Sequence, residues 1–114
     1  MTVTIWHNPR CSKSRQTLAL LQERCTDLTI RPYLTLPPST AELHTALTLL
    51  GLRPIDITRT GEALFKELGL SKTCDDSTVI AALAANPRLI ERPIVFANGA
   101  ARIGRPPEAV LEII

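Results

Sequence analysis

One cysteine of the sequence stands at a junction that favours a reactive thiol. Residues 2–6 form a β-branched and aromatic run typical of a strand, and residues 12–24 carry the apolar spacing of a helix. Cys11 therefore comes directly before the first turn of a helix, where unpaired N–H groups and the positive end of the helix dipole favour a thiolate. The sequence predicts a nucleophile at Cys11, and the alternative is a small buried apolar side chain.

Positively charged side chains flank this cysteine. Arg10 precedes it, and Lys13 and Arg15 follow in the first turn of the predicted helix. A unit charge close to a thiolate contributes more than the helix dipole, so these cations would favour ionisation strongly if they turned inward. The N–H groups at a helix start also bind oxyanions. We therefore expect the thiolate and an external anion to share one site.

The other thiols argue against a dithiol mechanism. Ser14 occupies the position at which a Cys-x-x-Cys redox protein keeps its resolving cysteine. Cys25 lies near the far end of the same predicted helix, roughly 20 Å from Cys11 and too far for a disulfide. Cys74 lies in an acidic loop beside Asp75. We expect both of these cysteines to be incidental, so that an adduct on Cys11 is resolved by another molecule.

The two histidines are the remaining candidates for acid–base or metal chemistry. His7 lies at the end of the first predicted strand, where it would orient Cys11 or help it to ionise, or serve the structure alone. His44 falls on the polar face of a predicted helix. Because His7 and Cys11 are the only close pair of potential ligands, the spacing predicts no metal site.

The central part of the chain has a helical texture. Residues 39–50 begin with a Ser-x-x-Glu capping box and are followed by Gly51, which predicts a helix with both ends defined. Shorter helices are predicted over residues 62–68 and 77–85, the latter capped by Asp75 or Asp76. Residues 39–86 therefore form a helical block.

Strands surround this block. Residues 28–33 predict a second strand that Pro32 ends, and residues 94–97 and 100–103 flank the hairpin signal Asn98-Gly99. Pro106 and Pro107 then start a last helix, with Val110, Leu111 and Ile114 as its apolar face. This order predicts an α/β fold with a mixed four-stranded sheet flanked by helices. The helical insertion, about 39–90, lies between the second and third strands of a single domain of residues 1–114.

Composition limits the class of protein. The chain has 114 residues, 45% of them hydrophobic and 21% charged, and its net charge is +2. These values suit one globular domain and give no electrostatic footprint for a nucleic acid. No membrane span or export signal is expected. An odd number of cysteines without such a signal fits a reducing compartment, and we expect the cytoplasm.

Three segments together resemble the glutaredoxin-coupled arsenate reductase family, a group with the thioredoxin fold. They are His-Asn-Pro-Arg-Cys-Ser-Lys-Ser-Arg at 7–15, Glu-Arg-Pro-Ile-Val at 91–95 and Arg-Ile-Gly-Arg-Pro-Pro-Glu at 102–108. They follow the order and spacing of the family over essentially the whole chain. At positions 12 and 13 the chain has Ser-Lys, which is similar to the short subgroup of the family, whereas the resistance enzymes have Gly-Thr there.

The resemblance implies roles for individual residues. Cys11 would attack arsenate, and Arg59, Arg92 and Arg105 match the three arginines that stabilise the oxyanion. Pro93 matches the cis-proline that faces the active cysteine in thioredoxin folds, so we expect a cis Arg92–Pro93 bond. Glutathione, as co-substrate, and glutaredoxin would complete the cycle.

The combined prediction is a cytoplasmic arsenate reductase with no bound cofactor or metal, in which His7, Ser14, Arg15 and Pro93 support the reacting thiol. Its partners would be arsenate or a similar oxyanion, glutathione and glutaredoxin, with no nucleic acid and no membrane. Two alternatives stay open: a thiol-dependent reductase of another substrate, and an Spx-like regulator that uses the same fold to bind RNA polymerase. Ser14 argues against the regulator, because that branch usually carries Cys-x-x-Cys.

Overall fold

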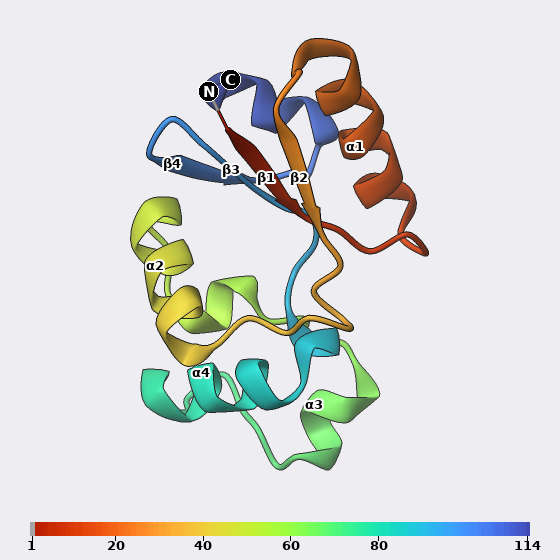
Figure 1. The fold of residues 1–114 in the computed structure, drawn as a ribbon. Helices are drawn as coiled ribbons and strands as arrows, with labels where there is room; N and C mark the ends of the chain where they lie inside the picture. Colours follow the sequence, from red (N-terminus) through yellow and green to blue (C-terminus); the bar gives the residue numbers. More distant parts are fainter. Residues whose placement is uncertain (1) are drawn as a thin grey trace. The chain divides into compact units, whose positions relative to one another are not determined.

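The computed structural model describes residues 2–114, and the chain separates into two compact units. The first unit comprises the chain up to Leu36 together with Arg92–Ile114. The second unit is Pro37–Glu91, and it contains the helical block predicted from the sequence. The elements of each unit can be followed in Figure 1.

The first unit is built on a mixed four-stranded sheet. Its strands are β1 (Val3–Trp6), β2 (Leu28–Arg31), β3 (Ile94–Ala97) and β4 (Ala100–Ile103), in the spatial order β2-β1-β3-β4. The β1 and β2 strands are parallel, whereas β3 is antiparallel to both β1 and β4. This arrangement confirms the predicted fold class. It also places the segment before β3 near the chain segment that follows β1.

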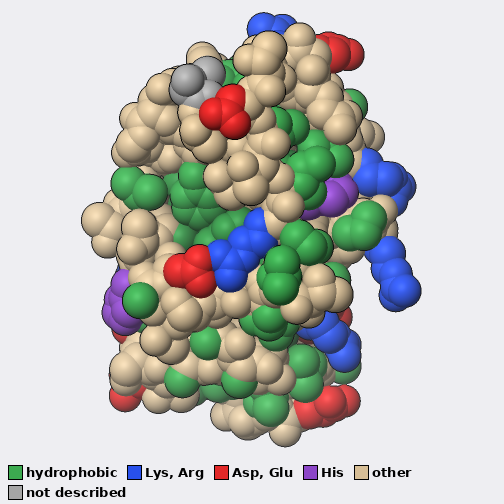
Figure 2. Space-filling view, in the orientation of Figure 1, with side chains coloured by type: hydrophobic (Ala, Val, Ile, Leu, Met, Phe, Trp, Pro, Cys, Tyr) green, Lys and Arg blue, Asp and Glu red, His purple; other side chains and the backbone are tan. Residues whose placement is uncertain are grey.

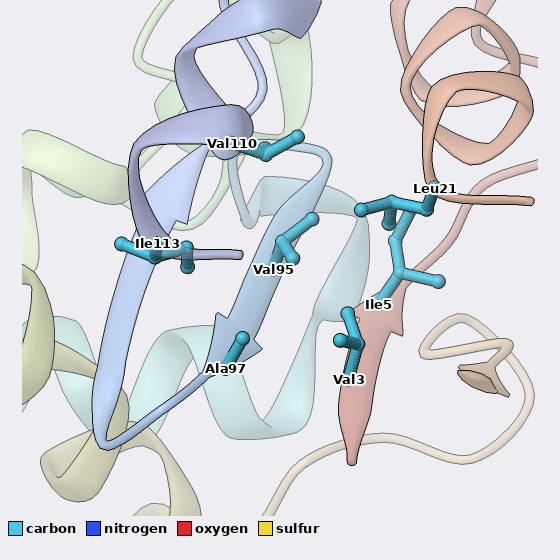
Figure 3. Packing of buried hydrophobic residues seen from close by; sticks show 7 residues of the cluster. All are labelled: Val3, Ile5, Leu21, Val95, Ala97, Val110 and Ile113. Carbon is cyan, nitrogen blue, oxygen red and sulfur yellow. The ribbon is translucent and has the colours of Figure 1, made fainter. Parts of the chain in front are cut away.

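One face of this sheet carries the core of the unit. The helix α1 (Ser12–Arg24) and the 3₁₀ helix η3 (Pro107–Ile113) contact each other as well as the sheet. Figure 3 shows side chains from β1, β3, α1 and η3 that pack together there. The buried members of the cluster are Val3, Ile5, Leu21, Val95, Ala97, Val110 and Ile113.

The last element differs from its prediction. An α-helix with Val110, Leu111 and Ile114 as its apolar face was expected, but η3 is a 3₁₀ helix and its buried side chains are Pro107, Val110 and Ile113. With three residues per turn, side chains three apart lie directly above one another. The tighter winding therefore moves the buried face from Ile114 to Ile113.

Two local signals of the first unit behave as predicted. The β2 strand ends at Arg31, directly before Pro32. In the β3–β4 turn, Asn98 and Gly99 have φ values of 53° and 70°, which is the left-handed region that a type I′ hairpin requires. The Asn98 side chain also donates from Nδ2 to the Ile113 carbonyl at 2.8 Å, so the turn holds the end of η3.

The second unit is helical. Its α-helices are α2 (Thr40–Leu50), α3 (Ala63–Glu67) and α4 (Asp76–Ala85), and the short 3₁₀ segments Pro54–Ile57 and Pro87–Leu89 were not predicted. The capping box of α2 is formed, because Ser39 and Glu42 exchange side-chain and backbone hydrogen bonds. These details confirm the predicted boundaries of α2. In α4, the N-cap residue is Asp75 and not Asp76.

The helices are short throughout the chain. The longest, α1, has 13 residues. Within residues 2–114, none reaches the length and apolar character that crossing a bilayer requires.

Candidate active site

Cys11 is the N-cap residue of α1, as the sequence predicted. Its backbone is extended, with φ of −96°, and its carbonyl accepts the N–H of Arg15 at 3.0 Å, which starts the helix. Its own N–H donates to the Asn8 carbonyl at 3.1 Å, so the preceding loop is a closed turn. The Cys11 residue is only 8% exposed. A nearly buried sulfur therefore faces the free N–H groups of the first helical turn.

The surroundings of Cys11 favour the ionised form of its thiol. Burial alone raises the pKa of Cys11, but hydrogen bonds from the backbone N–H groups of Ser14 and Lys13 lower it. The charge of Arg92 and a hydrogen bond from its side chain lower it further. These favourable interactions outweigh desolvation, and the pKa of Cys11 lies below the usual value for a thiol. The site therefore supports a thiolate nucleophile.

Two arginines come to this sulfur from the opposite end of the chain. Arg105 Nη2 lies 3.6 Å from Cys11 Sγ, and Arg105 Nε donates to the Arg92 carbonyl at 2.9 Å. Arg92 acts on the sulfur through the charge and hydrogen bond described above. The Arg92–Pro93 bond is cis, which confirms the expectation, and the Arg105–Pro106 bond is also cis, which was not predicted. Both guanidinium groups thus belong to the surroundings of the thiol.

A buried hydrogen-bond network lies behind the cysteine. The His7 Nδ1 and Ser14 Oγ atoms are 2.7 Å apart, and Ser14 Oγ also accepts the Asn8 N–H at 3.0 Å. Burial lowers the pKa of His7, and the charge of Arg15 lowers it further, so the imidazole is neutral at pH 7. With Ser14 fully buried, the network ties the end of β1 to the first turn of α1. It fixes the turn whose N–H groups face the sulfur.

The cations next to Cys11 in the sequence are exposed rather than turned inward. Arg10 and Lys13 are exposed, and Arg15 Nη1 donates to the Pro9 carbonyl at 2.9 Å. Figure 2 shows Lys and Arg side chains standing out into solvent over the loop before α1 and its first turns. The positive charge that lowers the pKa of Cys11 comes instead from Arg92. Sequence adjacency was therefore a poor guide to the cation at the sulfur.

Arg59 lies in the second unit, where its own bonds are local. Its N–H donates to the Leu89 carbonyl at 2.7 Å, beside the bridge between Thr58 and Ile90. Its guanidinium forms an ion pair with Glu62 and donates to the Arg88 carbonyl at 3.4 Å. Thus Cys11, Arg92 and Arg105 come together within the first unit, and Arg59 is held by its neighbours in the second.

The other thiols and the second histidine occupy different surroundings. Cys25 is the C-cap of α1 and packs against the core cluster. Cys74 is half-buried, and its sulfur accepts the Ser71 N–H at 3.4 Å. The His44 side chain is exposed, as predicted. Across residues 2–114, the structure contains no group of three or more His, Cys, Asp or Glu side chains arranged to hold a metal ion.

Comparison with known proteins gives consistent matches over the whole chain. Residues 6–113 match the model of the ArsC family. The chain is 49% identical over 114 residues to the uncharacterised protein YfgD of Escherichia coli K12, covering 98% of this chain and 96% of that protein. It is 43% identical over 114 residues to an arsenate reductase of Neisseria meningitidis, covering 98% and 97%.

Solved structures show the same architecture. An arsenate reductase from Vibrio cholerae superposes with a TM-score of 0.94 at 49% identity, covering 100% of this chain and 98% of that one. The mixed four-stranded sheet with its flanking helices is therefore the thioredoxin-like arrangement expected from the sequence.

Proposed function

The chain belongs to the ArsC family, and from this premise we propose that it is an arsenate reductase whose nucleophile is Cys11. One observation carries the proposal: a nearly buried thiol with a lowered pKa has a guanidinium nitrogen of Arg105 3.6 Å from its sulfur. A thiolate beside such donors is suited to attack an anionic electrophile, because the donors neutralise the charge that would otherwise repel it.

In the first step, the Cys11 thiolate attacks the arsenic of arsenate. A sulfur–arsenic bond forms, and one arsenate oxygen leaves as water after it has been protonated. Arg92 and Arg105 donate to the remaining oxygens, where negative charge increases in the transition state. Planar guanidinium groups suit this task because each can donate two parallel hydrogen bonds to a tetrahedral oxyanion.

In the second step, glutathione reduces the arsenic. Its thiolate attacks the sulfur of Cys11, a disulfide bond forms, and the sulfur–arsenic bond breaks. The electron pair of that bond stays on arsenic, which leaves as arsenite. Glutaredoxin then attacks the glutathione sulfur of the mixed disulfide and releases the Cys11 thiolate. Both electrons come from thiols, so the scheme uses glutathione as co-substrate and no bound cofactor.

The supporting residues act through the shape of the loop. His7 and Ser14 hold the first turn of α1, whose backbone N–H groups favour the Cys11 thiolate. Arg15 donates to the Pro9 carbonyl and so closes the loop before α1. The Pro93 carbonyl accepts the Gly104 N–H beside the site. Arg59 is proposed as a third oxyanion-binding arginine on the family resemblance alone.

The positions of the three thiols fit a mechanism in which an external thiol, and not a second cysteine of the chain, resolves the adduct on Cys11. Cys11 and Cys25 occupy the two ends of α1, and all three cysteines are free in the structure. Free thiols suit a reducing compartment, so we place the reaction in the cytoplasm.

The proposal is tested by NADPH oxidation coupled through glutathione reductase, glutathione and glutaredoxin, with and without arsenate. Arsenate-dependent oxidation that Cys11→Ser abolishes is expected. Oxidation that starts without arsenate on another oxidised substrate would favour the general thiol reductase. No oxidation under any condition, together with binding to RNA polymerase, would favour the regulator and overturn the proposal.

A further inference from the structure

Gly104 lies beside the candidate active site, where its backbone packs closely against Thr17 and Pro93. It directly follows β4, and its N–H donates to the Pro93 carbonyl at 2.9 Å. An added Cβ would come within 2.5 Å of Thr17 Oγ1, 2.7 Å of Pro93 Cγ and 3.2 Å of Pro93 Cδ. No unstrained structure tolerates carbon contacts this short, so the position has room for glycine only.

The atoms that surround Gly104 cannot move aside easily. Thr17 is fully buried, and its hydroxyl donates to the Lys13 carbonyl at 2.8 Å, within the first turns of α1. Pro93 is buried, and its ring leaves it little freedom. A side chain at position 104 would therefore displace backbone on both sides.

The segments on both sides of this contact carry the arginines. Arg105 follows Gly104, and Arg92 precedes Pro93. Arg105 reaches across to the Arg92 carbonyl at 2.9 Å and to Cys11 Sγ at 3.6 Å. The spacing of these two backbone segments therefore sets where the Arg105 guanidinium lies relative to the sulfur.

We infer that Gly104 is a positioning residue, which holds the guanidinium groups of Arg105 and Arg92 at the distance from Cys11 that an arsenate-sized oxyanion requires. The inference rests on the proposed function for the identity of the anion. The positioning of the two guanidinium groups can be tested without arsenate, because the same arrangement lowers the pKa of Cys11. Gly104 acts through its neighbours and touches no reacting atom.

Gly104→Ala tests this inference in a chain whose other cysteines are replaced by serine, so that thiolate absorbance reports on Cys11 alone. Gly61→Ala is the matched control, because an added Cβ there meets no atom within 4 Å and the backbone is not left-handed. Two quantities are measured on the folded protein: the pKa of Cys11, and the arsenate concentration that half-protects Cys11 from alkylation.

Gly104→Ala should raise the pKa of Cys11 and raise the half-protecting arsenate concentration about tenfold, equivalent to about 1.4 kcal/mol. Gly61→Ala should change neither. In an Arg105→Ala background, the effect of Gly104→Ala on protection should become smaller, because one of the two guanidinium groups that it positions is gone. Thr17→Ala combined with Gly104→Ala removes the shortest collision, so it should recover part of the loss and provides a second variant if Gly104→Ala does not fold.

Three results would overturn the inference. The first is a folded Gly104→Ala protein that matches Gly61→Ala in both quantities. The second is an equal loss of protection with and without Arg105, which indicates a general structural effect. The third is a failure of the Thr17→Ala combination to recover either quantity. Absence of arsenate protection in the unmodified protein would instead refute the proposed function, and the pKa of Cys11 would still decide the role of Gly104.

Discussion

Charge and geometry can be separated by experiment at Arg105. Its Nη2 lies 3.6 Å from Cys11 Sγ, and its Nε donates to the Arg92 carbonyl at 2.9 Å. Lysine in its place keeps a positive charge but loses the planar pair of donors. Methionine removes both. Comparing Arg105→Lys with Arg105→Met therefore asks whether the site needs a cation or a correctly oriented guanidinium.

The contact distance sets the magnitudes. Two unit charges 3.6 Å apart interact by ~4.6 kcal/mol at an effective dielectric constant of 20 and by ~1.2 kcal/mol in bulk water. Because the Arg105 side chain is exposed, the lower figure applies, so its charge contributes little to the ionisation of Cys11. Loss of a donor to a developing oxyanion costs more, ~2.7–4 kcal/mol, or a factor of ~10²–10³ in turnover.

We therefore expect Arg105→Lys to lower arsenate turnover by about 10²–10³ while the pKa of Cys11 changes little, because lysine keeps the positive charge. Turnover is measured by the glutaredoxin-coupled oxidation of NADPH, and the pKa by the pH profile of Cys11 alkylation with a neutral reagent. Arg24→Lys and Arg88→Lys, both on exposed residues, are the controls. Turnover within tenfold of the unmodified protein, or a loss fully explained by the lost thiolate, would refute the reasoning.

Four further outcomes follow from the same site. Cys11→Ser should abolish arsenate turnover in the coupled assay, whereas Cys25→Ser and Cys74→Ser should retain most of it; a comparable loss in the Cys74 variant would indicate an internal resolving thiol. Because the pKa of Cys11 is lowered, its alkylation rate should level off at a lower pH than the rates of the other two thiols, and a rate that rises through an apparent pKa near ~8.5 would contradict its activation. Arg92→Met should raise the pKa of Cys11 more than Arg105→Met does, since Arg92 supplies both a charge and a hydrogen bond; alkylation profiles in the reverse order would exclude this. Burial and Arg15 lower the pKa of His7 in the fold below the unfolded value of about 6.5, so the unfolded chain binds more protons in acid and stability falls as the pH drops below about 6.5. His7→Gln should flatten this part of the pH dependence of thermal unfolding, and an unchanged slope would show that His7 does not cause it.

The sequence predicted those parts of the fold that depend on local chemistry. The capping box of Ser39 and Glu42 needs only residues three apart, and the Asn98-Gly99 turn needs only two residues that tolerate a left-handed backbone. Cys11 at the start of α1 was predictable for the same reason, since a strand pattern ends and a helix pattern begins on either side of it. Each of these signals lies within a few residues of the feature that it specifies.

Other features depend on contacts between distant parts of the chain. The sequence of η3 suits either kind of helix, and the segment packs on the sheet and on α1, which come from distant parts of the chain. The cations at the sulfur are Arg92 and Arg105, which come from the segments before β3 and after β4, while Arg10 beside the cysteine stays exposed. Family resemblance identified Arg92 and Arg105, but the residues alone gave no reason to prefer them over the neighbouring cations.

The distribution of these interactions also explains which side chains near Cys11 are free to vary. The donors of the first turn are the backbone N–H groups of Lys13 and Ser14, which any residue except proline would supply in the same place. The Lys13 side chain is exposed, so its charge adds little to a group that it does not face. Ser14 differs, because its hydroxyl is buried between His7 and the Asn8 N–H and shapes the turn. Position 13 can therefore carry other side chains while the backbone N–H groups of the turn still favour the Cys11 thiolate, whereas position 14 requires a small hydroxyl to keep the turn in this shape.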